Sequence, residues 1–261
     1  MASLTDALFP YIYVQLLAVV RIVGIVAFAP AFSAHAVPVS VRACFALSLG
    51  AIMGAHISRA QIVEFSGLGA YIIAIFTELA FGAVIGFGLS LLFEAIRFAG
   101  EALDVQIGLS QATALDPATT NQTAVISRAY YFVALIIFLE LDGHHWVLAG
   151  LGHSFEIVPL GGANFSHGLV ELILDLVGSI FSVGLRLAAP AMAAVFLTDL
   201  AFGFIARVVP QMNVFLVGIP AKLLVGLAVL SVSAPLLLYT VALLVSDLKE
   251  YIVAFVRVLG V

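Results

Sequence analysis

The sequence predicts an all-α fold of the membrane-associated class, built as a bundle of apolar helices. Hydrophobic residues make up 64% of the 261 residues, whereas ordinary soluble domains reach about 45–50% with glycine included. Charged residues contribute only 10%, and the mean hydropathy is +1.23. The formal net charge is −5 with no basic cluster, so no nucleic-acid partner is expected.

Hydropathy divides the chain into apolar segments separated by breaks that contain proline, glycine or charge. Pro30 and Pro38 bracket a first turn, and residues 58–69 form a second connection that holds Arg59 and Glu64. Five to seven helices are expected, roughly over residues 8–33, 39–57, 68–98, 126–151, 170–189, 190–209 and 213–246.

The later breaks are less uniform. Residues 100–125 read as a polar loop, and the run from Pro159 to Gly162 ends a helix. Pro190 either kinks one long helix or separates two short ones. Pro210 and Pro220 flank a short irregular connection near the C-terminal third.

Charged residues lie well inside most of these helices, which distinguishes them from simple membrane spans. At the centre of a bilayer each charge costs at least about 2.5–3.5 kcal/mol, so such side chains normally face a protein interior or water. Glu94 and Arg97 share one helix face and can pair locally. The set as a whole predicts a polar lumen or burial against other subunits, and hence a larger assembly. It comprises Arg21, Glu78, Glu94, Arg97, Glu140, Asp142, Asp175, Arg186, Asp199 and Arg207.

Small residues recur at helical spacing in the segment GAVIGFG. Gly82 and Gly86 form a GxxxG pair, which lets two helix backbones approach closely. The pair predicts tight contact with another helix, and ordinary packing is a sufficient explanation for it.

The residues that invite a chemical interpretation do not form an active site. Asp142, His144 and His145 could suggest a metal, but adjacent residues on a helix point about 100° apart and the HExxH spacing is absent. A helix end at Gly143 is the better interpretation. No catalytic triad and no phosphate-binding loop is present, so we expect no catalytic residue, no metal and no cofactor. Cys44 is expected to be a buried structural thiol.

One polar segment stands out from this apolar background. Residues 106–121 contain Gly108, the Asp116–Pro117 pair and a run of uncharged polar side chains. The segment could be a solvent loop that joins two helices, but it is long for that role. Small, polar, uncharged side chains also suit a constriction that yields to a passing substrate. At membrane depth such a loop would have to line a cavity.

Several motifs make the chain similar to a known family. Arg21, Pro30, Pro38 and Arg42 match it, as do Glu78, Gly82 and Gly86. Four longer stretches also match: AGEALDVQIGLSQATALDP at 99–117, FLELDGHH at 138–145, SFEIVP at 154–159 and DLAFGFIARVVPQMNVFLVGIPAKLLVGL at 199–227. On these residues the chain resembles the FliR family, a subunit of the flagellar type III protein-export gate with a related injectisome counterpart.

The resemblance implies an architecture and a set of partners. Kinked helical hairpins would pack into a hetero-oligomeric helical cone, with residues 1–165 resembling FliP and residues 166–261 forming a FliQ-like hairpin. This chain would be present once, with FliP and FliQ around a central pore and FlhB on the cytoplasmic side. Unfolded rod, hook and filament proteins would be the substrates. The location would be the bacterial inner membrane, in the flagellar basal body.

The resemblance also assigns roles to particular residues. A plug in the closed pore would be shaped by Gln106, Gly108, Leu109, Ser110, Asp116 and Pro117. Polar contacts with other subunits or the lumen are expected from Glu78, Arg97, Glu101 and Asp104. The turn of the C-terminal hairpin would comprise Pro210, Asn213, Phe215, Gly218, Pro220 and Lys222.

The sequence therefore predicts a non-enzymatic subunit of the flagellar export gate. An injectisome export subunit is one alternative. A secondary transporter with broken helices is another, although the paired interruptions that such transporters show in two halves are not evident here.

Overall fold

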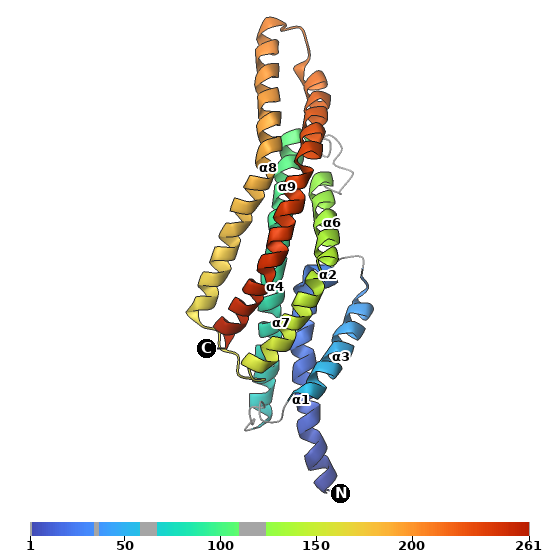
Figure 1. Ribbon diagram of the computed structural model, residues 1–261, viewed down its shortest axis with the longest axis vertical. Helices are drawn as coiled ribbons and strands as arrows, with labels where there is room; N and C mark the ends of the chain where they lie inside the picture. Colours follow the sequence, from blue (N-terminus) through green and yellow to red (C-terminus); the bar gives the residue numbers. More distant parts are fainter. Residues whose placement is uncertain (1, 34–36, 58–66, 110–123, 261) are drawn as a thin grey trace. The chain divides into compact units, whose positions relative to one another are not determined.

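Every secondary-structure element in the described part of the chain is an α-helix, which confirms the all-α prediction (Figure 1). The structure is a computed structural model of residues 1–261, and it describes all of them except 1, 34–36, 58–66, 110–123 and 261. The helices are α1 (Ala2–Phe28), α2 (Pro30–Ser33), α3 (Val39–His56), α4 (Leu68–Ile107), α6 (Val125–Glu140), α7 (Gly143–Ile157), α8 (His167–Val208) and α9 (Val214–Leu259).

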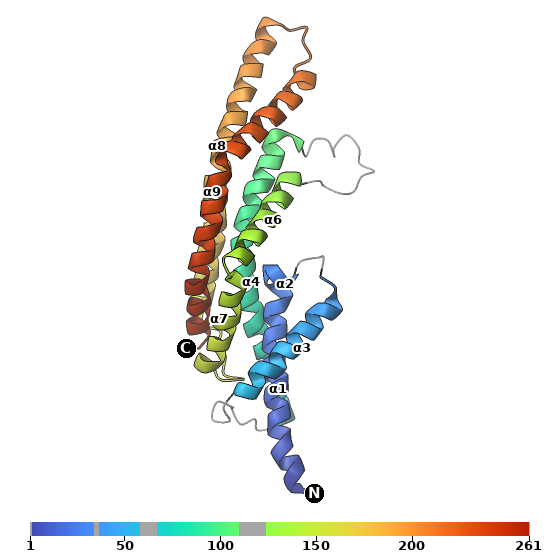
Figure 2. The same ribbon diagram turned by 45° about the vertical axis from the view of Figure 1, so that its right-hand side comes forward.

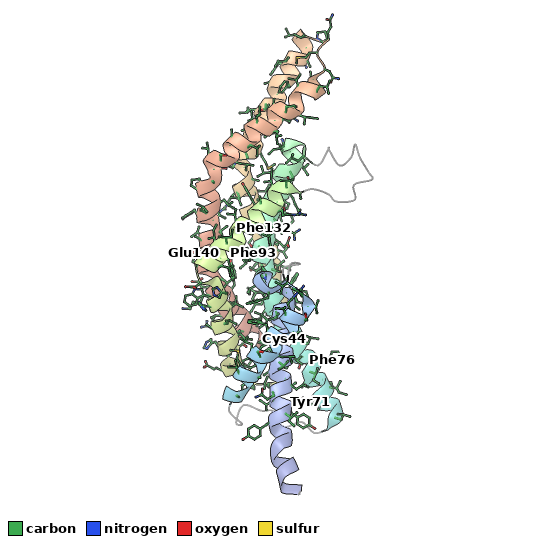
Figure 3. The ribbon with its side chains drawn as sticks, turned by 90° about the vertical axis from the view of Figure 1, so that its right-hand side faces the viewer. Cys44, Tyr71, Phe76, Phe93, Phe132 and Glu140 are labelled. Carbon is green, nitrogen blue, oxygen red and sulfur yellow. The ribbon has the colours of Figure 1, made fainter. Side chains whose placement is uncertain are left out.

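Four of the described helices are long and apolar enough to cross a membrane: α1 over Tyr11–Phe28, then α4, α8, and α9 over Leu216–Leu259. Apolar side chains also remain exposed on the outside of the helices. Phe76 on α4 is 66% exposed and Phe132 on α6 is 54% exposed (Figure 3). The chain is thus an all-α membrane bundle. The cone stays a prediction.

Several helix boundaries differ from the predicted ones. Helix α4 continues past residue 98 to Ile107, because Ala99, Leu103 and Ile107 repeat at helical spacing and are buried. The segment 126–151 is two helices, since Asp142 adopts a left-handed conformation with φ of 55° and ends α6 just before Gly143.

Three prolines lie inside the long C-terminal helices and do not end them. Pro190 lies inside α8, so the predicted segments 170–189 and 190–209 are one helix. Pro220 and Pro235 lie inside α9. Proline removes one backbone hydrogen bond from a helix interior, and the length of these helices shows that the flanking turns tolerate that loss. The prediction for Cys44 is wrong, because its thiol lies on an exposed face of α3.

The chain forms two compact units, each assembled from separate stretches of sequence. Unit 1 comprises Met1–Leu91, Asp142–Leu176 and Val245–Val261. Unit 2 comprises Leu92–Leu141 and Val177–Leu244. The expected division at residues 165 and 166 stays a prediction.

Glycines allow α1 and α4 to approach each other closely inside unit 1. A Cβ atom on Gly82 would collide with the carbonyl oxygen of Arg21, and one on Gly86 would lie 2.7 Å from the carbonyl oxygen of Ile25. On the facing helix, a Cβ on Gly24 would lie 2.6 Å from the carbonyl oxygen of Leu79. The GxxxG pair of α4 therefore packs directly on the backbone of α1.

Unit 2 is built around the C-terminal part of α4. Phe93 packs edge-on against Phe138 of α6, with ring centroids 5.5 Å apart. Gly184 lets α8 approach α4, since a Cβ there would lie 2.8 Å from the carbonyl oxygen of Ala95. Within this unit α8 and α9 run side by side as an antiparallel hairpin (Figure 1).

Candidate functional site

The C-terminal end of α4 and the N-terminal end of α6 lie side by side in unit 2 (Figure 2), and they border the segment that was predicted as a plug. Residue Ala124 precedes α6 and makes no side-chain cap. The carboxylate of Asp104 on α4 takes over that role. Its Oδ1 accepts a hydrogen bond from the Ile126 amide at 3.0 Å, and its Oδ2 accepts one from the Ser127 amide at 3.0 Å.

The first turn of α6 is also in direct contact with the α4 backbone. The Ser127 hydroxyl donates a hydrogen bond to the carbonyl oxygen of Arg97 at 3.1 Å. Gly100 makes room for this contact, because a Cβ there would lie 2.7 Å from the Ser127 amide nitrogen. Three features therefore hold the two helix ends together: a carboxylate cap, a hydroxyl bond and a glycine contact.

Of the predicted plug residues, the structure describes Gln106, Gly108 and Leu109. Gln106 is part-buried near the end of α4. Gly108 is buried and adopts a φ of 91°, a conformation that favours glycine and turns the chain out of the helix. Ser110, Asp116 and Pro117 lie outside the described residues, so their role in the plug stays a prediction.

Glu78, which was expected to contact a lumen or another subunit, lies in an intrachain ion pair. Its Oε2 accepts a hydrogen bond from Arg21 Nε at 2.5 Å and its Oε1 one from Arg21 Nη2 at 3.0 Å. Both side chains are fully buried in unit 1. Glu78 Oε1 also accepts from the Gly161 amide at 2.7 Å. A buried carboxylate is stable only with such partners, and here the chain itself supplies them.

Arg21 connects this pair to the end of α7. Its Nη1 donates to the Ser154 carbonyl oxygen at 3.1 Å, and its Nη2 donates to the Val158 carbonyl oxygen at 3.2 Å. The guanidinium also lies over the rings of Phe81 and Phe155, 4.2 and 4.6 Å from their centroids. Arg21 therefore adds a second donor to the Ser154 carbonyl oxygen, which also accepts from the Val158 amide, and bonds the Val158 carbonyl oxygen just beyond the helix. It joins α1, α4 and α7 within unit 1.

The other predicted polar residues lie on a partly exposed face of α4. Arg97 Nη1 is 2.8 Å from Glu94 Oε1, and its Nη2 is 3.6 Å from Glu101 Oε1. All three side chains are between 43% and 51% exposed. Nearby, burial raises the pKa of Tyr131 above its ordinary value of 10.0, with Arg97 opposing the shift and Glu94 adding to it. Contacts of Arg97 and Glu101 with other subunits stay a prediction.

The hairpin connection is shorter than the predicted turn. Pro210 and Asn213 lie between α8 and α9, whereas Phe215, Gly218, Pro220 and Lys222 lie in the first turns of α9. The Leu216 amide bonds to the Asn213 carbonyl oxygen at 3.1 Å, which starts α9 directly after the connection. Lys222 pairs with Asp199 of α8, so one of the embedded charges that the sequence left unassigned is neutralised within the hairpin.

The cluster at the α6–α7 junction is more compact than predicted. The rings of His144 and His145 lie 4.2 Å apart, although adjacent helical positions were expected to diverge. Ligand atoms of Asp142, His144 and His145 all lie within 4.8 Å of one another. His145 Nδ1 lies 3.0 Å from Asp142 Oδ1, and both of these side chains are 67% exposed. The expectation of no metal here stays a prediction.

Comparison with known proteins gives a match along most of the chain. Residues 12–248 match the family of bacterial export proteins, family 1. The flagellar biosynthetic protein FliR of Bacillus subtilis (strain 168) is 32% identical over 220 residues, which covers 83% of this chain and 84% of that protein. This chain belongs to the FliR family of bacterial export proteins.

Other FliR proteins give the same result. FliR of Escherichia coli (strain K12) is 30% identical over 217 residues, 83% of this chain and 82% of that protein. FliR of Aquifex aeolicus (strain VF5) is 30% identical over 234 residues, 89% of each chain. The sequence-based resemblance to FliR is therefore confirmed, and the flagellar assignment is favoured over the injectisome and transporter alternatives.

Proposed function

We propose that this chain is a structural, non-enzymatic subunit of the flagellar type III export gate in the bacterial inner membrane. It forms, with FliP and FliQ, the pore through which unfolded rod, hook and filament proteins are exported. The observation that carries the proposal is the family match over residues 12–248, together with similarity to flagellar biosynthetic proteins along more than four fifths of the chain.

The surface of the single chain supports membership in an assembly. In the most apolar 18 residues of α8 and of α9 only 17% are buried within the chain, so most of each of these stretches must be covered by lipid or by other subunits. Asp175, Arg186 and Arg207 are exposed on α8. Charges on an apolar helix avoid lipid, so they favour protein neighbours or a water-filled lumen over part of this surface. FliP, FliQ and FlhB are the partners that the family resemblance implies.

The proposal includes a plug formed by the connection between α4 and α6, with Ser110, Asp116 and Pro117 in it. Two described features support this assignment. The connection leaves α4 through Gly108, whose φ of 91° turns the chain sharply, and its two ends are joined by the buried carboxylate of Asp104. Such an arrangement fixes the two ends of a long connection, as a plug between α4 and α6 requires.

Replacement of residues 110–120 by a short Gly/Ser linker tests this function. In the assembled gate the variant is expected to conduct small ions at rest, because the bulk that closes the pore is removed while both helix ends stay in place. The measurement is the ion permeability of vesicles that contain the purified complex. Vesicles with wild-type complex and vesicles without protein are the controls, and an unchanged permeability with full assembly would contradict the plug.

A further inference from the structure

Asp104 differs from the other acidic residues of α4 because its carboxylate is buried and both of its oxygens accept hydrogen bonds from backbone amides of another helix. Asp104 is only 3% exposed. Glu94 and Glu101 on the same helix are about half exposed and pair with Arg97. No basic side chain within the described residues pairs with Asp104.

The positive end of the α6 dipole supplies the compensation that an ion pair would otherwise give. The amides of Ile126 and Ser127 are among the first of α6, which have no acceptor inside the helix. A carboxylate that accepts two such amides forms charge-assisted hydrogen bonds, and these are stronger than neutral ones. The cap therefore fixes both the position and the direction of the first turn of α6 relative to α4.

The rest of α6 is held to α4 by separate contacts. Phe93 packs on Tyr131 and Phe138 in the middle and at the far end of α6, with centroids 6.0 and 5.5 Å away. Ala134 and Phe138 are fully buried or nearly so. Loss of the cap should therefore release the first turn of α6 while the remainder of the helix stays packed.

We propose that Asp104 is a positioning residue of the export gate, which holds the first turn of α6 against α4 and so keeps the two ends of their connection together in the closed pore. The inference rests on the proposed gate function. It goes beyond that function by assigning the closed arrangement to one carboxylate and two amides, which lie outside the plug itself.

Asp104→Asn is the test variant, because it keeps the shape of the side chain and removes one acceptor. The Asn side chain has a single oxygen, and its NH2 group donates instead of accepting, so either the Ile126 or the Ser127 amide loses its bond. We expect the resting ion permeability of vesicles containing the complex to rise about tenfold, with assembly and export of hook and filament proteins retained.

Ser127→Ala is a graded variant at the same two helix ends. It removes the hydroxyl bond to the Arg97 carbonyl oxygen but leaves both amide bonds to Asp104, so its permeability should rise less than that of Asp104→Asn, because a neutral hydrogen bond is weaker than a charge-assisted one. The control is Ser154→Ala, which removes a buried hydroxyl from unit 1 and should leave permeability at the wild-type level. Equal rises in all three variants would overturn the role of Asp104 and indicate a general structural weakening.

The Gly/Ser replacement of residues 110–120 distinguishes failure of the Asp104 proposal from failure of the plug proposal. A leak from that replacement without a leak from assembled Asp104→Asn would overturn the role of Asp104 and leave the plug intact. The absence of a leak from both would overturn the plug and the inference with it.

Amide hydrogen exchange of the wild-type complex keeps the inference testable if the variant does not assemble. The amides of Ile126 and Ser127 should exchange at least tenfold more slowly than unbonded amides, because the carboxylate protects them. Exchange at the rate of unprotected amides would contradict the proposed cap.

Discussion

Replacement of Arg21 by Ala is expected to destabilise the chain by about 3–5 kcal/mol, more than any other substitution proposed for this chain. It leaves the Glu78 carboxylate fully buried without a cation, and it removes the Arg21 donor from the carbonyl oxygens of Ser154 and Val158. Since whole proteins are stable by only about 5–15 kcal/mol, the variant should assemble poorly. The measurement is the thermal unfolding midpoint of the purified complex in detergent, together with the amount of chain in the membrane.

The double variant Arg21→Met, Glu78→Leu separates charge from shape. Replacing both members of a buried pair with apolar side chains of similar size is often close to neutral, so this variant should recover much of the lost stability. Glu94→Gln is the exposed control, because its pair with Arg97 is almost half exposed and such pairs contribute about 0–1 kcal/mol. Equal losses in Arg21→Ala and Glu94→Gln would contradict the importance of burial.

Gly82→Ala is expected to destabilise unit 1 by about 1–3 kcal/mol, because the added methyl group would collide with the Arg21 backbone and push α1 away from α4. Helix propensity alone predicts the opposite sign, since Ala is favoured over Gly by about 1 kcal/mol in a helix interior. The same unfolding midpoint measures the effect.

Gly203→Ala is the matched control for this substitution. Gly203 also lies inside a long helix, but nothing approaches within 4 Å of a Cβ placed there. It should therefore be neutral or slightly stabilising within the chain. Gly82→Ala with the same result as Gly203→Ala would show that α1 and α4 are not held at the distance described here.

The all-α class and the approximate positions of the helices could be predicted from the sequence, because apolar periodicity and many of the proline and glycine breaks are local signals. The run from Pro159 to Gly162 does end α7, and the GxxxG pair does mark a close helix contact. The end of α4 was placed too early, because Glu101 and Asp104 read as loop residues. In the structure Glu101 lies on the exposed face of α4, and the carboxylate of Asp104 caps the N-terminus of α6.

The partners of the polar residues could not be predicted in the same way. Arg21 and Glu78 are 57 positions apart, and Asp104 and Ile126 are 22 apart. No sequence periodicity relates residues that are so far apart. Their need for partners could be inferred only from the free-energy cost of an unpaired charge in an apolar environment. That cost predicts a polar lumen or other subunits for the set of embedded charges as a whole, with local pairs for a few of its members. For Arg21, Glu78 and Asp199 the structure finds partners within the chain.

The most direct test of the proposed function is deletion of the gene in its host, with hook and filament proteins assayed in the culture medium. If the chain is a subunit of the flagellar export gate, both proteins should disappear from the medium while remnants of the basal body stay in the membrane. A plasmid copy of the gene should restore both proteins. Normal export of hook and filament proteins by the deletion strain would contradict the account.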